Sequence, residues 1–247
     1  MALGRGSIVQ RAFATERDLV DALIDGLPSL LALPGGLLQA REVTHDARVV
    51  DVVAILEADD LDLILASWEQ PLRVLGRLSR AHLTLLAVIW AERRISLRRL
   101  AHATWTPEDV LASGLLRDLC ASGLVDVNSR GTCSPTGWAQ WSPGRIVAIE
   151  AKLTDWKQCL EQAAETAVWA DLSYTAFPAP GPLDWESVRA ALTKRRIGGL
   201  AVSPLDGPSL VVKAASGGPA SRRRRAVFAL ALLRDLVAGK RWTSLSA

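Results

Sequence analysis

Hydrophobic positions recur at helical spacing within residues 16–33, which predicts an amphipathic helix near the start of the chain. Two runs rich in β-branched residues follow at 39–44 and 49–56, separated by a short polar turn, and they predict a pair of strands. The second run is apolar except for Asp51 in its middle. A carboxylate in such a run costs free energy to bury unless it binds a cation or an arginine. Asp51 is therefore the first residue that calls for a chemical explanation.

The pattern next predicts a separate unit of three helices and a hairpin. The helices are expected around 83–90, at 96–103 and at 106–122, and the two strands at 124–127 and 132–135. The third helix and the hairpin, with the sequence LLRDLCASGLVDVNSRGTCSPTGWA, resemble those of the winged helix-turn-helix family. This resemblance implies a winged-helix domain at 79–141, inserted into a domain that is formed by 1–78 and 142–247.

Strands and helices alternate after the insertion. The expected elements are a strand at 145–153, a helix at 155–170, a strand at 172–177, a helix at 185–195, strands at 199–203 and 209–214, and a largely apolar helix at 222–238. This order predicts an α/β protein, in which helices flank a mixed sheet.

The strand at 145–153 carries two charged residues, Glu150 and Lys152, among apolar neighbours. Alternate residues of a strand share a face, so the two side chains are expected to project together. If the strand that contains Asp51 lies alongside, two carboxylates and one ammonium group meet. Two carboxylates suit Mg²⁺ or Mn²⁺, with water and phosphate oxygens as further ligands, and the lysine would orient or help deprotonate an attacking water.

These residues resemble the active-site pattern of the PD-(D/E)xK nuclease superfamily: an Asp on one strand, Glu-x-Lys on the next, then a helix. Asp51, Glu150 and Lys152 match the pattern, although no proline precedes Asp51. Gln162 matches a glutamine that many members place on the following helix, and Glu16 and Glu42 lie where some members carry an extra acid. The resemblance implies a restriction-endonuclease-like fold, Asp51 and Glu150 as metal ligands, and metal-dependent DNA hydrolysis in repair or in defence against foreign DNA.

Two other functions are compatible with the same residues. The three charged groups would also be explained by a structural ion pair, in which case the nuclease fold would serve DNA binding or regulation without catalysis. The chain would alternatively be a protein-interaction subunit of a repair or defence assembly, with the winged helix contacting a partner. Many members of the superfamily dimerise, which makes a homodimer the expectation by analogy.

The charge distribution is uneven. Residues 1–78 hold 7 basic and 12 acidic side chains, whereas residues 146–247 hold 14 and 9, and 24 of the 29 basic residues are arginine. This composition permits a nucleic-acid partner without requiring one. The arginines expected to contact DNA phosphates are Arg93, Arg94, Arg98, Arg99, Arg222 and Arg223. Acidic residues in the helix at 106–122 argue against that helix as a DNA contact and favour a protein partner for it.

Several other classes are disfavoured. The cysteines Cys120, Cys133 and Cys159 are odd in number and show no CxxC spacing, which disfavours a disulfide framework or a structural zinc site and points to a reducing cytoplasm. The longest apolar run, 226–233, is far shorter than the roughly 20 residues that span a membrane. The start of the chain lacks the apolar segment of a signal peptide, so secretion is not expected.

Overall fold

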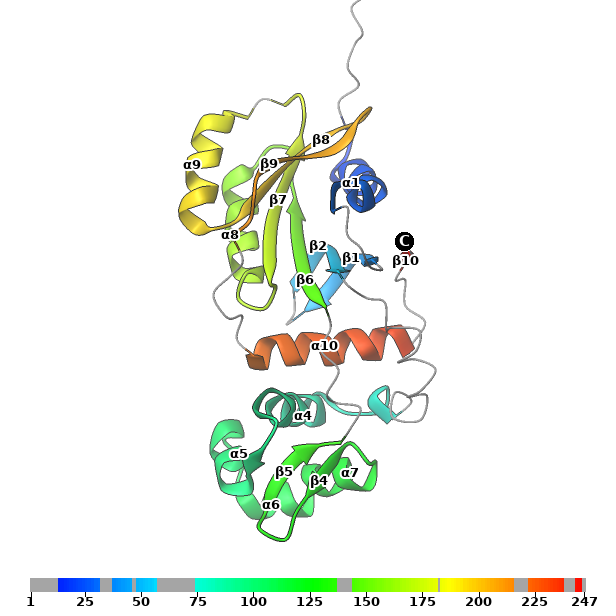
Figure 1. Ribbon diagram of the computed structural model, residues 1–247, viewed down its shortest axis with the longest axis vertical. Helices are drawn as coiled ribbons and strands as arrows, with labels where there is room; N and C mark the ends of the chain where they lie inside the picture. Colours follow the sequence, from blue (N-terminus) through cyan, green and yellow to red (C-terminus); the bar gives the residue numbers. More distant parts are fainter. Residues whose placement is uncertain are drawn as a thin grey trace, which may run out of the picture.

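The computed structural model describes residues 13–31, 37–45, 48–56, 74–136, 144–181, 183–215, 222–237 and 243–245. Two bodies are stacked along the long axis, a large one built on a sheet and a smaller, mainly helical one, and a single helix lies between them (Figure 1). In this part of the chain no helix combines the length and the apolar character that crossing a membrane requires.

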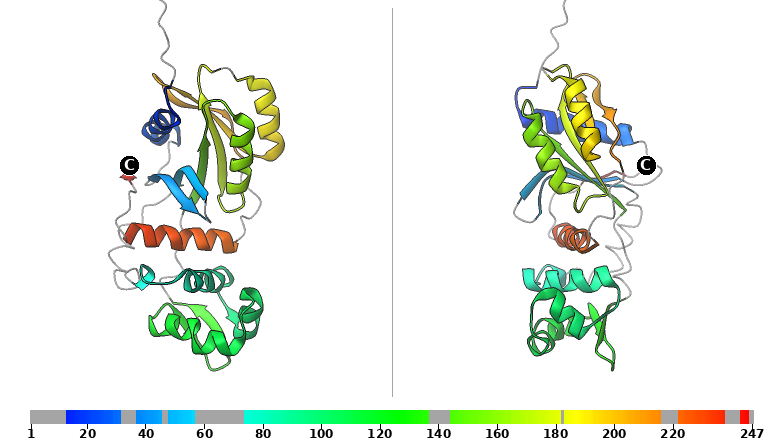
Figure 2. Two further views of the ribbon diagram at one scale, coloured as in Figure 1. Left: turned by 180° about the vertical axis from the view of Figure 1, so that it is seen from behind. Right: turned by 90° about the vertical axis from the view of Figure 1, so that its left-hand side faces the viewer.

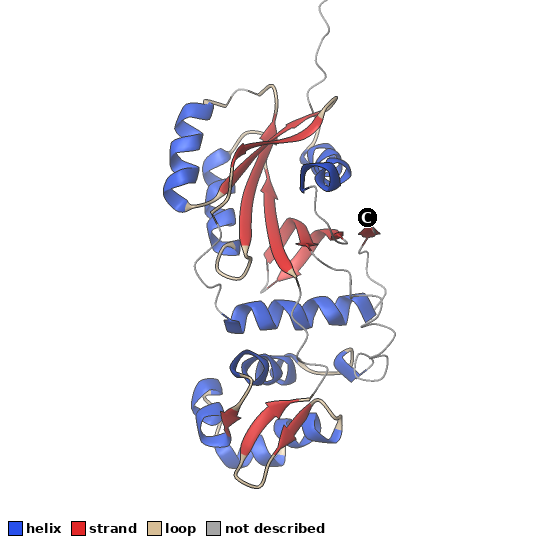
Figure 3. Ribbon diagram, in the orientation of Figure 1, coloured by secondary structure: helices blue, strands red, loops and turns tan. Residues whose placement is uncertain are grey.

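The large body is built on a mixed sheet of seven strands in the order β10-β1-β2-β6-β7-β8-β9 (Figure 3). Its strands are β1 (Leu37–His45), β2 (Arg48–Leu56), β6 (Arg145–Ala151), β7 (Leu172–Pro178), β8 (Gly198–Ser203), β9 (Gly207–Val212) and β10 (Thr243–Leu245). The strands β6, β7 and β8 are parallel, and the other neighbouring pairs are antiparallel. The expected α/β class and mixed sheet are therefore confirmed, and β10 is a strand that the hydrophobic pattern did not predict.

Helices cover both faces of this sheet. The helix α1 (Glu16–Leu31) packs on one face with four fully or nearly fully buried residues, whereas α8 (Trp156–Thr166) and α9 (Trp185–Arg195) pack on the other. Asp155 caps α8, since its side chain accepts a hydrogen bond from the backbone N–H of Gln158 at 3.0 Å. The parallel strands β6 and β7 are joined through α8, which forms the crossover connection that parallel neighbours require.

The small body contains the elements expected for 79–141, with two differences. Its elements are α4 (Arg80–Glu92), β3 (Ile95–Ser96), α5 (Leu97–Thr104), α6 (Glu108–Ser113), α7 (Leu115–Ala121), β4 (Val125–Val127) and β5 (Thr132–Pro135). The single helix predicted at 106–122 is wrong, because Gly114 leaves helical geometry with φ −117° and ψ −104° and separates α6 from α7. The two-residue strand β3, which pairs with β5, was also missed. Ser96 caps α5, since its side chain accepts a hydrogen bond from the backbone N–H of Arg99 at 3.3 Å.

The helix α10 (Arg222–Val237) packs against both bodies, and it lies between them in every view (Figure 2). Ala226, Ala229, Leu230 and Leu233 join the core of the small body. From another side of the same helix, Phe228 and Leu232 join the core of the sheet. Apolar residues on more than one side of this helix are thus explained, because each side buries against a different body.

One glycine of α1 is required by the approach of β9. A Cβ atom built on Gly26 would lie 2.1 Å from Cδ of Pro208, and a proline ring cannot swing away. Gly26→Ala should therefore lower the free energy of unfolding by about 1–3 kcal/mol, because overpacking outweighs the gain in helix propensity. Urea denaturation would measure the change, with the exposed Ser29→Ala on the same helix as control. A Gly26→Ala protein as stable as the parent would contradict the close packing.

Candidate metal site and cleft

The regular alternation of side chains along β2 breaks at Asp51. Val53 packs on the α10 side of the sheet and Val52 on the α1 side, as alternation requires, but Val50 packs on the α10 side as well. In the neighbouring strand the register places Glu42 opposite Asp51, and Glu42 has a left-handed φ of 52°. Non-glycine residues rarely adopt this conformation, and they often do so where function needs an irregular backbone. Asp51 therefore lies at a built-in irregularity of the sheet.

Asp51 and Glu150 lie next to each other on adjacent strands. The antiparallel ladder between β2 and β6 ends at the pair Val52–Ile149, which places Asp51 and Glu150 at the next facing positions. Oδ2 of Asp51 accepts a hydrogen bond from the backbone N–H of Ala151 at 2.7 Å. The carboxyl groups of Asp51 and Glu150 also lie close enough for each to influence the pKa of the other. The juxtaposition expected from the sequence is thus present.

The environment of these two acids disfavours a charge on both of them. Burial, followed by the charge of Asp51, raises the pKa of Glu150 to about 8, and its side chain is only 3% exposed. Burial also raises the pKa of Asp51, against the opposing effects of the Ala151 N–H and the charge of Lys152. With its pKa raised to about 8, Glu150 therefore keeps its proton at neutral pH, unless a cation compensates a second charge beside Asp51.

Lys152 follows the last residue of β6, and its side chain pairs with α1. Its Nζ lies 3.0 Å from Oε2 of Glu16, which is in the first turn of that helix. The strand ends at Ala151, so the alternation that predicted a shared face for Glu150 and Lys152 does not extend to the lysine. Lys152 nevertheless lies close enough for its charge to act on both Asp51 and Glu150.

The environment of Lys152 keeps it protonated. Burial alone would lower the pKa of Lys152, but the hydrogen bond with Glu16 and the charges of Asp51 and Glu16 outweigh burial and raise it. A lysine of this kind is suited to stabilising negative charge and to orienting an oxygen atom, and poorly suited to accepting a proton. The sequence suggested Glu16 and Glu42 as additional acidic residues of the site. In the structure Glu16 pairs with Lys152, whereas Glu42 is exposed on β1.

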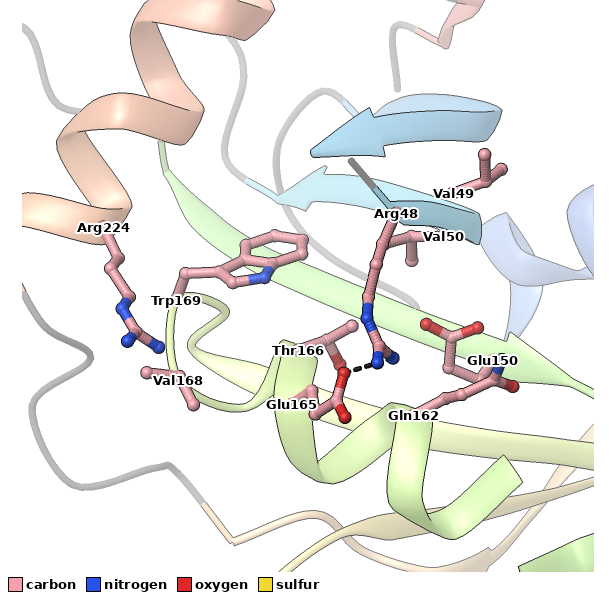
Figure 4. Close-up of a pocket in the computed structure, with 10 residues that line it drawn as sticks. All are labelled: Arg48, Val49, Val50, Glu150, Gln162, Glu165, Thr166, Val168, Trp169 and Arg224. Carbon is pink, nitrogen blue, oxygen red and sulfur yellow. Dashed lines mark ion pairs between the residues drawn. The ribbon is translucent and has the colours of Figure 1, made fainter. Parts of the chain in front are cut away.

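A cleft of about 590 Å³ opens beside Glu150, between β2, α8 and the start of α10 (Figure 4). Its lining residues are Arg48, Val49, Val50, Glu150, Gln162, Glu165, Thr166, Val168, Trp169 and Arg224. Gln162 lies beside Glu150, and its Oε1 is buried without a hydrogen-bond partner among the described residues. A buried amide oxygen without a partner indicates a place for a water or ligand donor.

The donor chemistry fits a hard divalent cation. Asp51 and Glu150 supply carboxylate oxygens from two strands, and Mg²⁺ is commonly held by one or two carboxylates plus water and phosphate oxygens. No group of three or more His, Cys, Asp or Glu side chains suited to a metal occurs among the described residues, so two protein carboxylates are what this site provides. The buried Cys159 donates its S–H to the carbonyl of Glu150, and burial holds the pKa of this thiol well above its usual value, which disfavours it as a ligand.

The six arginines predicted to contact DNA gather where the two bodies meet. Arg93, Arg94, Arg98 and Arg99 follow from the end of α4 into α5, and Arg222 and Arg223 begin α10; all six are exposed. Glu92 connects the two groups, since its carboxylate lies 3.1 Å from Arg223 and 3.9 Å from Arg99. Glu92 therefore brings two segments that are far apart in the sequence next to each other, and we call their six arginines the arginine seam.

Three charged residues of the cleft were not singled out from the sequence. Glu165 follows Gln162 by three positions on α8, so helical spacing could have placed it on the same side. Arg48 starts the strand that contains Asp51, and Arg224 follows the two selected arginines of α10. The signal for Arg224 was the run of four arginines, which reads equally well as a solvated flank.

Comparisons of the chain with protein-family models, with curated proteins and with solved structures found no match. The chemistry of the site itself therefore has to carry any functional conclusion.

Proposed function

We propose that this protein is a metal-dependent DNA endonuclease with a restriction-endonuclease-like fold and an inserted winged helix. The observation that carries the proposal is the buried carboxyl group of Glu150 beside the partly buried one of Asp51, which adjacent strands hold next to each other beside a charged lysine and an open cleft. Burying two acids together is unfavourable in the free protein, so a functional reason for the arrangement is expected.

The topology supports the fold part of this proposal. The elements α1, β1, β2, β6, α8 and β7 follow one another in the order that the nuclease resemblance implies, and β1, β2, β6 and β7 are neighbours in the sheet. The small body supports a winged helix, because four helical segments, α4 to α7, precede a hairpin and β3 completes a three-stranded sheet. Its position between β2 and β6 explains the long separation of Asp51 from Glu150.

Each residue of the site has a distinct role in this proposal. Asp51 and Glu150 would hold Mg²⁺ or Mn²⁺, which when bound supplies Lewis acidity toward a phosphate oxygen and lowers the pKa of a bound water. Lys152, held by Glu16, places its positive charge beside the reacting phosphate and orients the attacking water. The free Oε1 of Gln162 accepts a hydrogen bond from that water or from the substrate. With the lysine protonated, deprotonation of the water falls to the metal site or to solvent.

The first test is cleavage of labelled duplex, single-stranded and branched DNA in Mg²⁺, Mn²⁺ or EDTA. Lys152→Met should lower kcat by about 100-fold or more while leaving DNA affinity within a few fold, because the charge acts mainly on the transition state. The matched control is Lys194→Met, an exposed lysine of α9 away from the cleft. Equal kcat values for the parent and the Lys152→Met protein would remove Lys152 from the mechanism.

The same assay separates the proposal from its rivals. A folded protein that binds DNA but does not cut any substrate with either cation would favour a non-catalytic DNA-binding role. A protein that neither cuts nor binds would favour a protein-interaction subunit, and the acidic helix α6 suits a protein partner better than a phosphate backbone. The homodimer remains a prediction by analogy, and sedimentation velocity would measure it.

A further inference from the structure

Two arginines enter the cleft from separate elements, and the proposed catalysis uses neither of them. Arg48 projects from the start of β2, and Arg224 projects from the first turn of α10 (Figure 4). The indole of Trp169 lies between them, only 5% exposed, and it forms an apolar wall. The cleft thus has Glu150 and Gln162 at one end, Arg48 in the middle and Arg224 at the other end.

Within the described ranges, Glu165 is the one carboxylate that pairs with Arg48. Its guanidinium forms an ion pair with Glu165 of α8, and both side chains are more than half exposed, at 58% and 51%. The charge of Arg48 also acts on Glu150, which places the guanidinium near the proposed metal site. An exposed ion pair of this kind contributes little to stability, so its loss to a competing anion costs the protein little.

We propose that Arg48 and Arg224 bind successive phosphates of one DNA strand along this cleft, and that Glu165 holds Arg48 in place until a phosphate replaces it. The inference rests on the proposed function, since the carboxylate pair identifies the anion as a phosphodiester. A guanidinium can donate two parallel hydrogen bonds to a phosphate. In the free protein Nη1 of Arg48 pairs with one carboxylate oxygen of Glu165.

The path continues beyond the cleft. Arg222 and Arg223, which precede Arg224 at the start of α10, belong to the arginine seam. Because α10 packs into the cores of both bodies, the seam and the cleft keep a fixed relation to each other. A strand that leaves the cleft at Arg224 therefore meets further guanidinium groups at Arg223 and at the start of α5. Guanidinium groups that follow one another from Arg48 through Arg224 to Arg223 suit a polyanion better than a small phosphate ester.

The test is binding of fluorescein-labelled duplex DNA to the full chain in a Glu150→Gln background, which removes cleavage from the readout. Arg48→Gln and Arg224→Gln should each raise Kd about five- to tenfold and reduce the slope of log Kd against log salt by about one. The matched control is Arg189→Gln, an exposed arginine of α9, which should change neither quantity. Circular dichroism would verify that every variant is folded.

Glu165 acts as a positioning residue, and a double-mutant cycle separates this role from a purely structural one. Glu165→Gln should lower Kd about threefold, because DNA then no longer competes with a carboxylate for Arg48. In the Arg48→Gln protein the same change should have no effect. A loss of stability with an unchanged Kd would instead show that Glu165 serves only packing, and would overturn its proposed role.

The outcomes distinguish this inference from the proposed function. If Arg48→Gln and Arg224→Gln leave Kd and its salt slope unchanged, the phosphate path is wrong, even where the parent protein cleaves DNA. If the parent does not cleave but both variants weaken binding, the nuclease proposal fails and the path stands. No measurable DNA binding by the parent or the Glu150→Gln protein would overturn both.

Discussion

Glu150→Gln should abolish metal-dependent cleavage and, at the same time, stabilise the metal-free protein. We expect the cleavage rate to fall by about 10³-fold or more, because the variant loses one of two carboxylates that would hold the cation. The free energy of unfolding in EDTA should rise by roughly 1–3 kcal/mol at pH 8, because a neutral amide removes the cost of a buried charge beside Asp51. Activity and stability therefore change in opposite directions at one position.

The sign of the pH dependence follows from the raised pKa. In the unfolded chain Glu150 loses its proton near pH 4.5, whereas in the folded protein it keeps the proton up to about pH 8. Between these values the folded state binds a proton that the unfolded state has lost, so its contribution to stability falls as the pH rises. Denaturation in EDTA at several pH values would measure this.

Two variants test whether Glu150 causes this pH dependence of stability. The Glu150→Gln protein should lack this part of the pH dependence, and its advantage over the parent should nearly vanish below pH 5. Glu161→Gln, an exposed glutamate of the same region on α8, should leave both the cleavage rate and the pH dependence unchanged. Parallel stability curves for the parent and the Glu150→Gln protein would mean that Glu150 is not held protonated by its neighbours.

Phe228→Ala should cause the largest loss of stability predicted for α10, about 3–5 kcal/mol. Phe228 is 1% exposed, and its ring stacks on Trp169 with centroids 4.5 Å apart and an interplanar angle of 17°. Removing the ring leaves a cavity under the wall of the cleft, so DNA affinity should fall as well. Urea denaturation followed by tryptophan fluorescence would measure the stability.

The neighbouring position provides the control for this prediction. Val227 is partly buried against the core of the small body, and Val227→Ala should cost less than half as much, because fewer buried atoms are removed. A loss below about 1 kcal/mol for Phe228→Ala would contradict the packing of α10 on the sheet.

The sequence predicted the strands of the site better than the direction of its side chains. Asp51 and Glu150 stand out because acids interrupt apolar runs, and this pattern is enough to place them on neighbouring strands. The position of Lys152 was less predictable. Strand periodicity does not indicate that β6 ends at Ala151 or that Lys152 forms an ion pair with Glu16 of α1. The same holds for the face change at Asp51, which lies opposite the left-handed Glu42.

The cleft could not be derived from the sequence, since its walls come from three distant segments. Arg48, Glu165 and Arg224 meet only because β2, α8 and α10 pack around one end of the sheet. The split of the predicted helix at Gly114 is a local effect, yet Leu111, Leu115 and Leu119 keep helical spacing across the break and mask it. Periodicity reports which residues are buried, and it does not report a change of helix axis.

The place of α10 in the chain has a consequence for how the protein is made. Its residues complete the cores of both bodies, although they follow the other members of those cores along the chain. Until residue 233 has emerged from the ribosome, the apolar faces of α4 and of β2 remain open to solvent and to other nascent chains. Arg224 likewise reaches its place in the cleft only then, so the complete cleft forms late in translation and a shorter ribosome-bound fragment would lack it.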